Sequence, residues 1–350
     1  MLNLAIIGCG VIAQYHLRAV ARLDTARVAA VCDVRAEAAE KTAAAFNIPR
    51  WTTRAAELFA DPAIDAVILA LPANLRTALG LEAFRHGKHV LTEKPVAMNA
   101  DEVRALLAAQ GDRVGACCSS RYRAMESAQV ATEFLRTGAL GALRTITCRA
   151  VQPAGAPPQN LPPAWRLRKD LNGGGLLLNW GCYDLDYLLG LLDFKLTPHH
   201  VLARTWTVGA PFTAYAAPGS DAETHIAGVA TFAEGCVLTY ERSEFSTMPH
   251  HHFWQITGEL GTLDLVMTKT TTTNLFLTTP DPVHGTTTRA LWTGDETTNT
   301  LEHDGPVHDF VAAILHHRRP RTTLEDALLL ARLSDAFYAS SAAGAPVAVA

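Results

Sequence analysis

Hydrophobic residues in the first third of the chain form short runs that alternate with longer amphipathic stretches. Five runs have the length of buried strands: Leu4–Ile7, Val28–Cys32, Ala66–Leu69, His89–Leu91 and Val114–Cys117. The stretches between them, such as Ile12–Arg22 and Leu75–Arg85, are rich in Ala, Leu and Arg, which favour helices. Buried strands that alternate with helices are typical of a parallel sheet covered on both faces. Residues 1–120 are therefore predicted to form a doubly wound α/β domain.

The pattern changes in the rest of the chain, where Thr, Val and aromatic residues recur in short runs between turns. The predicted strands are Leu143–Val151, His199–Val208, Thr224–Phe232, Cys236–Glu244, Phe253–Gly258 and Leu263–Met267. Because these runs lack intervening helices of useful length, a mainly antiparallel sheet is predicted. Helices are expected at Met125–Leu135, Gly175–Leu191 and Thr323–Ala343, and the last two are long enough to cover one face of that sheet.

Residues 121–350 are thus expected to form a second α/β domain, built on a large, mainly antiparallel open sheet. The terminal helix is a candidate for packing back near the domain junction. The Pro- and Gly-rich segment Gln152–Pro163 is interpreted as an extended connector or lid, and the four threonines Thr270–Thr273 as an exposed strand. The remainder of this half is expected to be loop.

The composition fits two globular domains. The 350 residues exceed what one hydrophobic core usually holds, and 49% of them are hydrophobic against 18% charged. The net charge is −4 and Lys and Arg form no block, so a nucleic-acid partner is not expected. No apolar run reaches the roughly 18 residues of a membrane span, and the N-terminus lacks the features of a signal peptide. The seven cysteines form no CxxC pair, which favours reduced thiols and a cytoplasmic location.

The turn after the first predicted strand carries a dinucleotide-binding pattern. Its sequence, IIGCGVIA, places Gly8, Gly10 and Ala13 between a strand and a helix, where backbone N–H groups meet a pyrophosphate. The expected cofactor contacts of this turn are Gly8, Gly10, Val11, Ile12 and Ala13. Asp33 follows Ala13 by 20 residues and suits the adenosine ribose hydroxyls. A carboxylate there favours NAD, while Arg35 leaves NADP open as the alternative.

A second motif, HGKHVLTEKP over residues 86–95, places Glu93 and Lys94 directly after a predicted strand, where open α/β sheets bind their ligands. Together with the glycine pattern, Asp33, Trp165-Arg166, a glycine-led helix and the terminal HDFVAAILHHRRP segment, it resembles the Gfo/Idh/MocA oxidoreductases, the glucose–fructose oxidoreductase and inositol dehydrogenase superfamily. The resemblance implies a nicotinamide-binding Rossmann domain and a sugar or cyclitol bound between the domains. It also implies a homodimer or homotetramer formed through the C-terminal sheet.

The resemblance assigns the catalytic lysine to Lys94. An ammonium group there hydrogen-bonds the reacting oxygen and stabilises its alkoxide character, and the Lys94–Pro95 bond is a candidate cis peptide. The family's second motif is GGG followed by D-x-G-x-H-x-x-D on a helix. In this chain Asn179 stands in place of the first Asp and Tyr183 in place of His, while Asp186 matches the last Asp. On a regular helix these three residues share one face.

Tyr183 is therefore expected to be the general acid/base, with Asn179 orienting a substrate hydroxyl or the lysine. The family's P-N-x-x-H loop is also altered, because Arg76 replaces its His. The expected cofactor contacts beyond the glycine turn are Asp33, Arg35, Leu71, Pro72, Asn74, Glu93, Lys94, Arg121, Trp165 and Arg166. The expected substrate contacts are Lys94, Arg121, Tyr122, Trp165, Asn179 and Tyr183.

The histidines at His250–His252 do not predict a metal site, because consecutive side chains on a strand point to opposite faces and no carboxylate or cysteine stands at ligand spacing. The leading hypothesis is an NAD(P)-dependent oxidoreductase that acts on a secondary alcohol or ketone of a sugar, sugar derivative or cyclitol. One alternative is a glycoside lyase or hydrolase that keeps NAD bound and oxidises its substrate transiently. Another is a non-catalytic nucleotide or sugar sensor.

Overall fold

The computed structural model describes residues 1–350, which divide into two compact units. The first unit comprises Met1–Arg121 and Thr300–Leu329, and the second comprises Tyr122–Asn299 and Leu330–Ala350. Residues 300–329 had been expected in the second domain. They belong to the first unit because Val307, Phe310 and Val311 lie in its hydrophobic core.

The first unit is built on a six-stranded parallel sheet with the strand order β3-β2-β1-β4-β5-β6. The strands are β1 (Leu2–Ile7), β2 (Ala26–Cys32), β3 (Trp51–Thr52), β4 (Ala66–Leu69), β5 (His89–Thr92) and β6 (Gly115–Cys117). The order reverses between β1 and β4, which is the point where doubly wound sheets bind their ligands. The predicted doubly wound fold is confirmed.

Six helices belong to the first unit: α1 (Val11–Ala21), α2 (Ala36–Ala45), α3 (Ala55–Phe59), α4 (Ala73–Arg85), α5 (Ala100–Gln110) and α9 (Leu301–Leu315). The expectation that the segment containing α9 is loop was wrong. Gly305 and Pro306 lie inside this helix and lower its intrinsic propensity, but Val307 and Phe310 are fully buried. Burial of the apolar face therefore outweighs the local preference.

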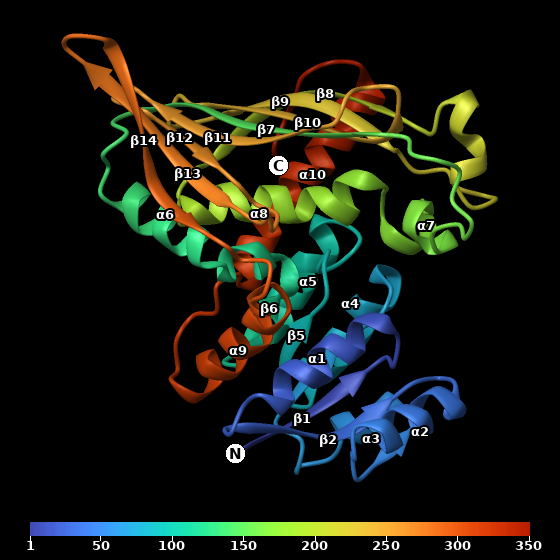
Figure 1. Cartoon of the computed structure of the whole chain (residues 1–350). Coiled ribbons are helices and arrows are strands. Elements are labelled where there is room, and N and C mark those ends of the chain that lie inside the picture. Colours follow the sequence, from blue (N-terminus) through green and yellow to red (C-terminus); the bar gives the residue numbers. More distant parts are fainter. The chain divides into compact units, whose positions relative to one another are not determined.

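The second unit contains a nine-stranded sheet with the order β14-β13-β12-β11-β7-β10-β9-β8-β15 (Figure 1). Its strands are β7 (Leu143–Pro153), β8 (Pro198–Trp206), β9 (His225–Phe232), β10 (Val237–Ser246), β11 (His251–Gly258), β12 (Thr262–Leu265), β13 (Thr273–Asp281), β14 (Gly285–Gly294) and β15 (Val347–Ala348). Strands β7 and β10 pair in parallel and all other neighbours are antiparallel. The predicted mainly antiparallel sheet is confirmed.

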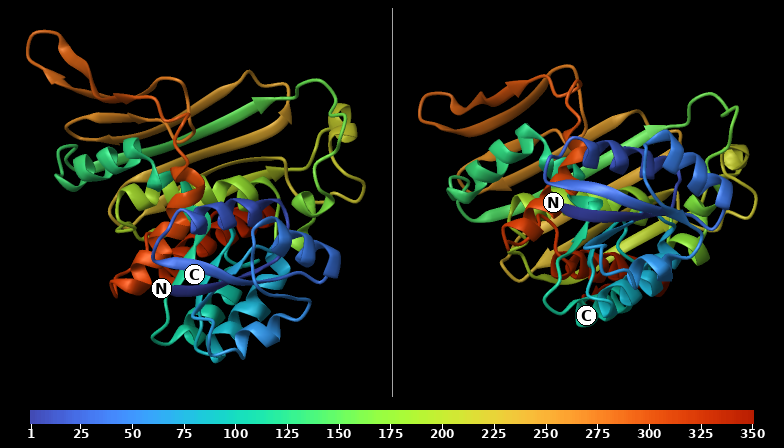
Figure 2. Two further views of the ribbon diagram at one scale, coloured as in Figure 1. Left: turned by 60° about the horizontal axis from the view of Figure 1, so that its bottom comes forward. Right: turned by 90° about the horizontal axis from the view of Figure 1, so that it is seen from below.

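The hairpin formed by β13 and β14 corrects the expectation of loop in this region. It projects from one edge of the sheet (Figure 2). Residues 285–290 of β14 are all exposed, so the strand lacks the alternation of apolar and polar residues that sequence analysis detects. The expected strand at Thr270–Thr273 was also wrong. Thr270 Oγ1 donates to Thr272 O at 2.9 Å in a turn, and only Thr273 belongs to β13, where it is buried.

Helices cover one face of this sheet and leave the opposite face open (Figures 1 and 2). The helices of this part of the chain are α6 (Glu126–Arg136), α7 (Lys169–Asn172), α8 (Cys182–Leu191) and the part of α10 (Leu324–Ala343) that begins at Leu330. Residues 154–163 have no regular structure, in keeping with the connector expected at Gln152–Pro163. All seven cysteines are free and buried. None of the helices combines the length and apolarity that crossing a bilayer requires.

Candidate active site

The turn between β1 and α1 has the shape that a dinucleotide pyrophosphate requires. Gly8 has a φ of +99°, and a Cβ at this position would lie 2.4 Å from Ala70 O, so only glycine fits. A Cβ on Gly10 would meet nothing within 4 Å, so the backbone there borders open space. Gly10 is the N-cap of α1 and provides no side-chain cap, which leaves the first N–H groups of the helix for an anion. The fully buried Ala13 keeps α1 close to the sheet.

Asp33 lies beside this turn at the end of β2. Its Oδ2 accepts a hydrogen bond from Cys9 N at 2.9 Å, and its Oδ1 accepts one from Arg35 N at 3.0 Å. These two backbone bonds fix the carboxylate at the edge where a ribose would bind. The Arg35 side chain is 73% exposed and its Nε is 3.5 Å from Asp33 Oδ1. The residues of β1, β2 and their turns therefore fit NAD.

Substitution of Asp33 by Asn is expected to weaken NADH binding about tenfold or more, because hydrogen bonds to a charged acceptor contribute about 1.5–3 kcal/mol. The same change removes the repulsion of a 2′-phosphate, so the ratio of the NADPH dissociation constant to the NADH dissociation constant should fall. Fluorescence titration with both nucleotides measures the two dissociation constants. Asp112→Asn, an exposed acid of the same unit, is the control. An unchanged ratio of the two constants would contradict the role assigned to Asp33.

The turn Glu93–Lys94–Pro95, called the Lys94 turn below, follows β5 at the same edge of the sheet. Glu93 is buried; its Oε1 lies 3.0 Å from His16 Nε2 and 3.8 Å from Arg121 Nη2, and its Oε2 accepts from Lys94 N at 3.1 Å. Burial by itself raises the pKa of the Glu93 carboxyl, but the hydrogen bond and charge of His16 and the charge of Arg121 hold this pKa well below its usual range. The Lys94–Pro95 peptide bond is cis, as expected, and Lys94 is partly exposed.

His16, Glu93 and Cys118 each offer an atom of a kind that binds metals, and these atoms lie within 4.8 Å of one another. Two observations favour an ion-pair cluster over a metal site. The Arg121 guanidinium stands 3.8 Å from the same carboxylate oxygen and opposes a second cation. Burial raises the pKa of the Cys118 thiol well above its ordinary value, and a protonated thiol is a poor ligand.

The loop between β4 and α4 contributes Leu71 and Pro72 to the same edge of the sheet, and Asn74 lies in the first turn of α4. Pro72 is the N-cap of α4, and Arg76 lies in the first turns of that helix. The Arg76 guanidinium is buried and donates from Nε to Leu71 O at 2.7 Å and from Nη1 to Glu93 O at 3.0 Å; Nη1 also donates to Pro95 O. This arginine therefore binds the backbone of two neighbouring loops.

In the second unit, the helix that carries Asn179 and Tyr183 begins at a buried carboxylate. Glu223 Oε2 accepts from Gly175 N and Oε1 accepts from Leu177 N, both at 2.9 Å. A Cβ on Gly175 would lie 2.1 Å from Glu223 O, which explains why glycine stands there. The stretch Leu177–Gly181 is π-helical and continues into α8. The expected regular spacing of Asn179, Tyr183 and Asp186 is thus altered by the wider turn.

Tyr183 is buried between two aromatic rings. The Tyr122 ring packs edge-on against it at a centroid distance of 5.2 Å, and the Trp180 ring does so at 5.8 Å. Asn179 is also buried. Asp186, in contrast, is engaged by Arg123, whose Nε donates to Oδ1 at 2.6 Å. Asn179 and Tyr183 thus lie on one helix, and Tyr122, which lies in the 3₁₀ turn Cys118–Ala124, contacts the Tyr183 ring.

A buried ion pair fixes the other side of the same helix. The Asp184 carboxylate is fully buried and accepts four hydrogen bonds: from Arg242 Nε at 2.6 Å, Arg242 Nη2 at 2.9 Å, Tyr240 Oη at 3.0 Å and Trp254 Nε1 at 3.0 Å. Burial lowers the pKa of Arg242, but the charge and hydrogen bonds of Asp184 raise it above its ordinary value. The Arg242 guanidinium also lies over the Trp180 ring, 4.9 Å from its centroid.

Trp165 and Arg166 lie on the second unit, in a 3₁₀ turn over Ala164–Leu167. Trp165 is partly exposed. Arg166 Nη2 donates to Glu244 Oε2 at 2.5 Å, so its guanidinium is engaged by a strand of its own unit. A cofactor-binding role for this pair stays a prediction.

The predicted residues therefore gather in two groups. The first unit brings Gly8–Ala13, Asp33, Leu71–Asn74, the Lys94 turn and Arg121 to one edge of its sheet, and the second unit brings Tyr122, Asn179 and Tyr183 together. Sequence analysis missed His16, Asp184, Glu223 and Arg242. The position of His16 gave one signal, because it shares the buried stripe of α1 with Ala13, Leu17 and Val20. The partners of the other three come from distant strands and helices, which no local pattern reveals.

Two family models match most of the chain. One, described as an oxidoreductase family with an NAD-binding Rossmann fold, matches residues 2–118, and the GFO/IDH/MocA C-terminal domain matches residues 128–264. Levoglucosan dehydrogenase of Pseudarthrobacter phenanthrenivorans is 28% identical over 222 residues, which are 60% of this chain and 56% of that protein. The 1,5-anhydro-D-fructose reductase of Ensifer adhaerens is 28% identical over 190 residues, covering 54% of this chain and 56% of that protein. These alignments span little more than half of the relatives' length.

The fold is also that of solved structures. Levoglucosan dehydrogenase in complex with NADH superposes with a TM-score of 0.84 at 20% identity, covering 100% of this chain and 99% of that chain. An NAD binding oxidoreductase from Klebsiella pneumoniae gives a TM-score of 0.86 at 22% identity with the same coverage. By its matches to both family models, the chain belongs to the GFO/IDH/MocA oxidoreductases, whose first domain is an NAD-binding Rossmann fold.

Proposed function

We propose that this protein is an NAD-dependent oxidoreductase that transfers hydride between nicotinamide and a secondary alcohol or ketone of a sugar, sugar derivative or cyclitol. The observation that carries the proposal is the arrangement of the first unit. A glycine turn fit for pyrophosphate, a fixed acid at the ribose position and a firmly held lysine turn lie at one edge of the sheet. The names of related proteins, which include an inositol 2-dehydrogenase of Rhizobium meliloti and a D-glucoside 3-dehydrogenase of Escherichia coli, support the substrate class.

The bound nicotinamide would supply the hydride acceptor or donor. In the proposed chemistry the Lys94 ammonium donates a hydrogen bond to the reacting oxygen and stabilises negative charge that develops there. The Tyr183 hydroxyl exchanges the proton of that oxygen, and Asn179 orients a hydroxyl group of the substrate through its amide. Trp180 and Tyr122 pack edge-on against the Tyr183 ring and so hold this side chain in place.

The cofactor form and the reaction type are tested together. The freshly purified protein is denatured, and released NAD(H) and NADP(H) are quantified by chromatography and mass spectrometry. Sugars, anhydrosugars and cyclitols are then screened with both nucleotides for the absorbance of reduced nicotinamide. Turnover with net change of NADH supports the proposal. Near-stoichiometric resident NAD with products but no net NADH would instead support the lyase or hydrolase alternative, and nucleotide binding without any turnover would support a sensor.

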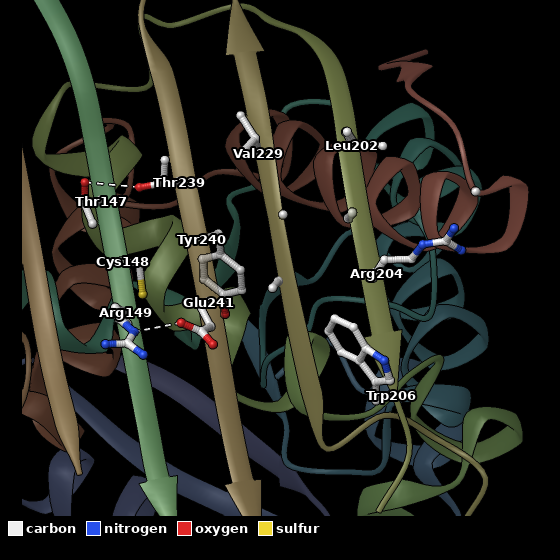
Figure 3. A pocket seen from close by; sticks show the side chains of 14 residues that line it. Thr147, Cys148, Arg149, Leu202, Arg204, Trp206, Val229, Thr239, Tyr240 and Glu241 are labelled. Atoms are coloured by element: carbon white, nitrogen blue, oxygen red, sulfur yellow. Dashed lines mark hydrogen bonds and ion pairs between the residues drawn. The ribbon is translucent and has the colours of Figure 1, made fainter. Parts of the chain in front are cut away.

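We further propose that the open face of the nine-stranded sheet binds a second copy of the chain. Three apolar side chains on this face are about half-exposed: Leu202 and Trp206 on β8 and Val229 on β9 (Figure 3). They border a shallow groove of about 670 Å³ that also includes Arg204 and Glu241. Half-exposed apolar side chains on an uncovered sheet face, bordered by charged residues, are typical of a protein interface. The seven free, buried thiols support a cytosolic location.

Substitution of Trp206 by Glu is expected to shift the protein toward monomer, because a carboxylate at this position would be desolvated in the interface. Analytical ultracentrifugation over a range of protein concentrations measures the change. Trp51→Glu is the matched control, since Trp51 is a similarly exposed tryptophan on β3 of the first unit. A wild-type protein that sediments as a monomer at all concentrations would refute the interface.

A further inference from the structure

Arg76 makes hydrogen bonds to the peptide groups on both sides of Lys94. Its Nη1 donates to the carbonyl oxygen of Glu93 at 3.0 Å and to that of Pro95, and its Nε donates to Leu71 O at 2.7 Å. The residue is only 4% exposed, so these bonds lie away from solvent. One guanidinium thereby joins the loop after β4 to the Lys94 turn after β5.

The rest of the Lys94 turn is held from the opposite side. The Glu93 carboxylate accepts from the backbone N–H of Lys94 and pairs with His16 on α1. Glu93 N also donates to Leu69 O at 3.1 Å and continues the pairing of β5 with β4. The turn is therefore held at the carbonyls of Glu93 and Pro95, at the backbone N–H of Lys94 and at the Glu93 side chain. Lys94 is its only partly exposed residue, because Glu93 and Pro95 are buried.

The chemistry of arginine explains why this residue type can bind the carbonyls of two loops at once. The guanidinium is planar and its N–H groups diverge, so one side chain can serve carbonyls in three directions. An imidazole has two ring nitrogens, and an ammonium group is a point donor on a flexible stem. An imidazole therefore cannot make all three bonds. An ammonium group has three N–H donors but carries them on one atom, whereas Arg76 reaches the three carbonyls from two nitrogens, Nε and Nη1.

We propose that Arg76 is a positioning residue that fixes the backbone of the Lys94 turn and thereby the direction of the Lys94 side chain. The proposal rests on the proposed function only for its effect on turnover, because the order of the turn itself can be measured without substrate. Loss of the Arg76 bonds removes a charged donor from three buried carbonyls, of which Glu93 O keeps only the weaker bond from Thr92 Oγ1 at 3.2 Å, and lets the turn sample other conformations. Misplacement of a catalytic group by about 1 Å lowers rates by up to about 100-fold.

The test compares Arg76→Met, Arg76→His and Arg76→Lys with Arg85→Met, which removes an exposed arginine from the end of the same helix. Arg76→Met is expected to lower kcat about 10- to 100-fold while the dissociation constant of NADH changes less than about threefold. Arg76→Lys should recover part of this loss, and Arg76→His should recover less. Arg85→Met should match the wild type.

Hydrogen–deuterium exchange of the ligand-free protein provides the readout that does not need activity. In Arg76→Met and Arg76→Lys, the peptide covering residues 89–97 is expected to exchange about tenfold faster, with peptides from β1 and α1 unchanged. If Arg76→Met does not fold, the exchange rate of the same peptide in Arg76→Lys tests the proposal. The proposal would be overturned if that peptide exchanged at the wild-type rate in the Arg76 variants, or if Arg85→Met accelerated its exchange equally. Faster exchange in a protein that oxidises no sugar would uphold the positioning role and reject the proposed function instead.

Discussion

Lys94→Met is expected to lower kcat about 10²- to 10⁴-fold, because methionine keeps the length of the side chain but cannot hydrogen-bond or stabilise a developing alkoxide. The dissociation constant of NADH should stay close to that of the wild type. The turn that carries Lys94 is held by Arg76 and by the Glu93 carboxylate, and neither group needs the ammonium. Steady-state kinetics with the sugar found by screening, together with NADH fluorescence titration, separates these two effects.

Lys41→Met provides the matched control, since Lys41 is an exposed lysine on α2. Lys94→Arg distinguishes charge from geometry. It retains the positive charge but places bulkier donors on a different stem, so it should restore only a small part of the rate. Turnover of Lys94→Met within a factor of about two of the wild type would show that another group stabilises the reacting oxygen.

The largest loss of stability is expected for Asp184→Asn, at about 3–5 kcal/mol in the free energy of unfolding of the second unit. The substitution keeps the size of the side chain but leaves the Arg242 guanidinium buried without its counter-charge. Arg242 and Asp184 are both nearly inaccessible, with side-chain exposures of 7% and 0%. Water therefore cannot replace the carboxylate, and the full cost of burying the unpaired charge is subtracted from the free energy of unfolding. Urea denaturation followed by tryptophan fluorescence measures the loss.

Two further variants test whether charge burial is the cause. Asp193→Asn breaks the Asp193–Arg136 pair, in which the arginine side chain is 57% exposed, and should cost about 1 kcal/mol or less. Asp184→Asn combined with Arg242→Met removes both charges and should be more stable than Asp184→Asn alone. If Asp184→Asn lowers the free energy of unfolding by no more than Asp193→Asn does, the buried network contributes no more to stability than a surface ion pair.

Local sequence patterns predicted the sheet architecture because buried strands require runs of apolar residues that can be recognised in the sequence. The runs at Leu4–Ile7 and Ala66–Leu69 are apolar throughout, and the structure buries every residue of both runs. The nucleotide turn was equally readable, since its chemistry is contained in one strand–turn–helix segment. Prediction failed for β14, which exposes most of its residues, and for α9, whose Gly305 and Pro306 oppose a helix. Backbone pairing with the preceding strand β13 forms β14, and packing against distant residues of the first unit's core forms α9.

The candidate site shows the same division. The glycine turn, Asp33, Lys94 and Tyr183 could be predicted as candidate site residues from the sequence alone, because each lies in a motif whose spacing is local. The groups that hold them became visible only in the folded chain: His16 and Arg76 around the Lys94 turn, Glu223 at the start of the Tyr183 helix, and Arg242 on Asp184 behind it. These contacts join residues far apart in the chain. The physical reason is that a buried charge or carbonyl needs a partner, and which distant segment supplies it depends on the packing of the whole unit.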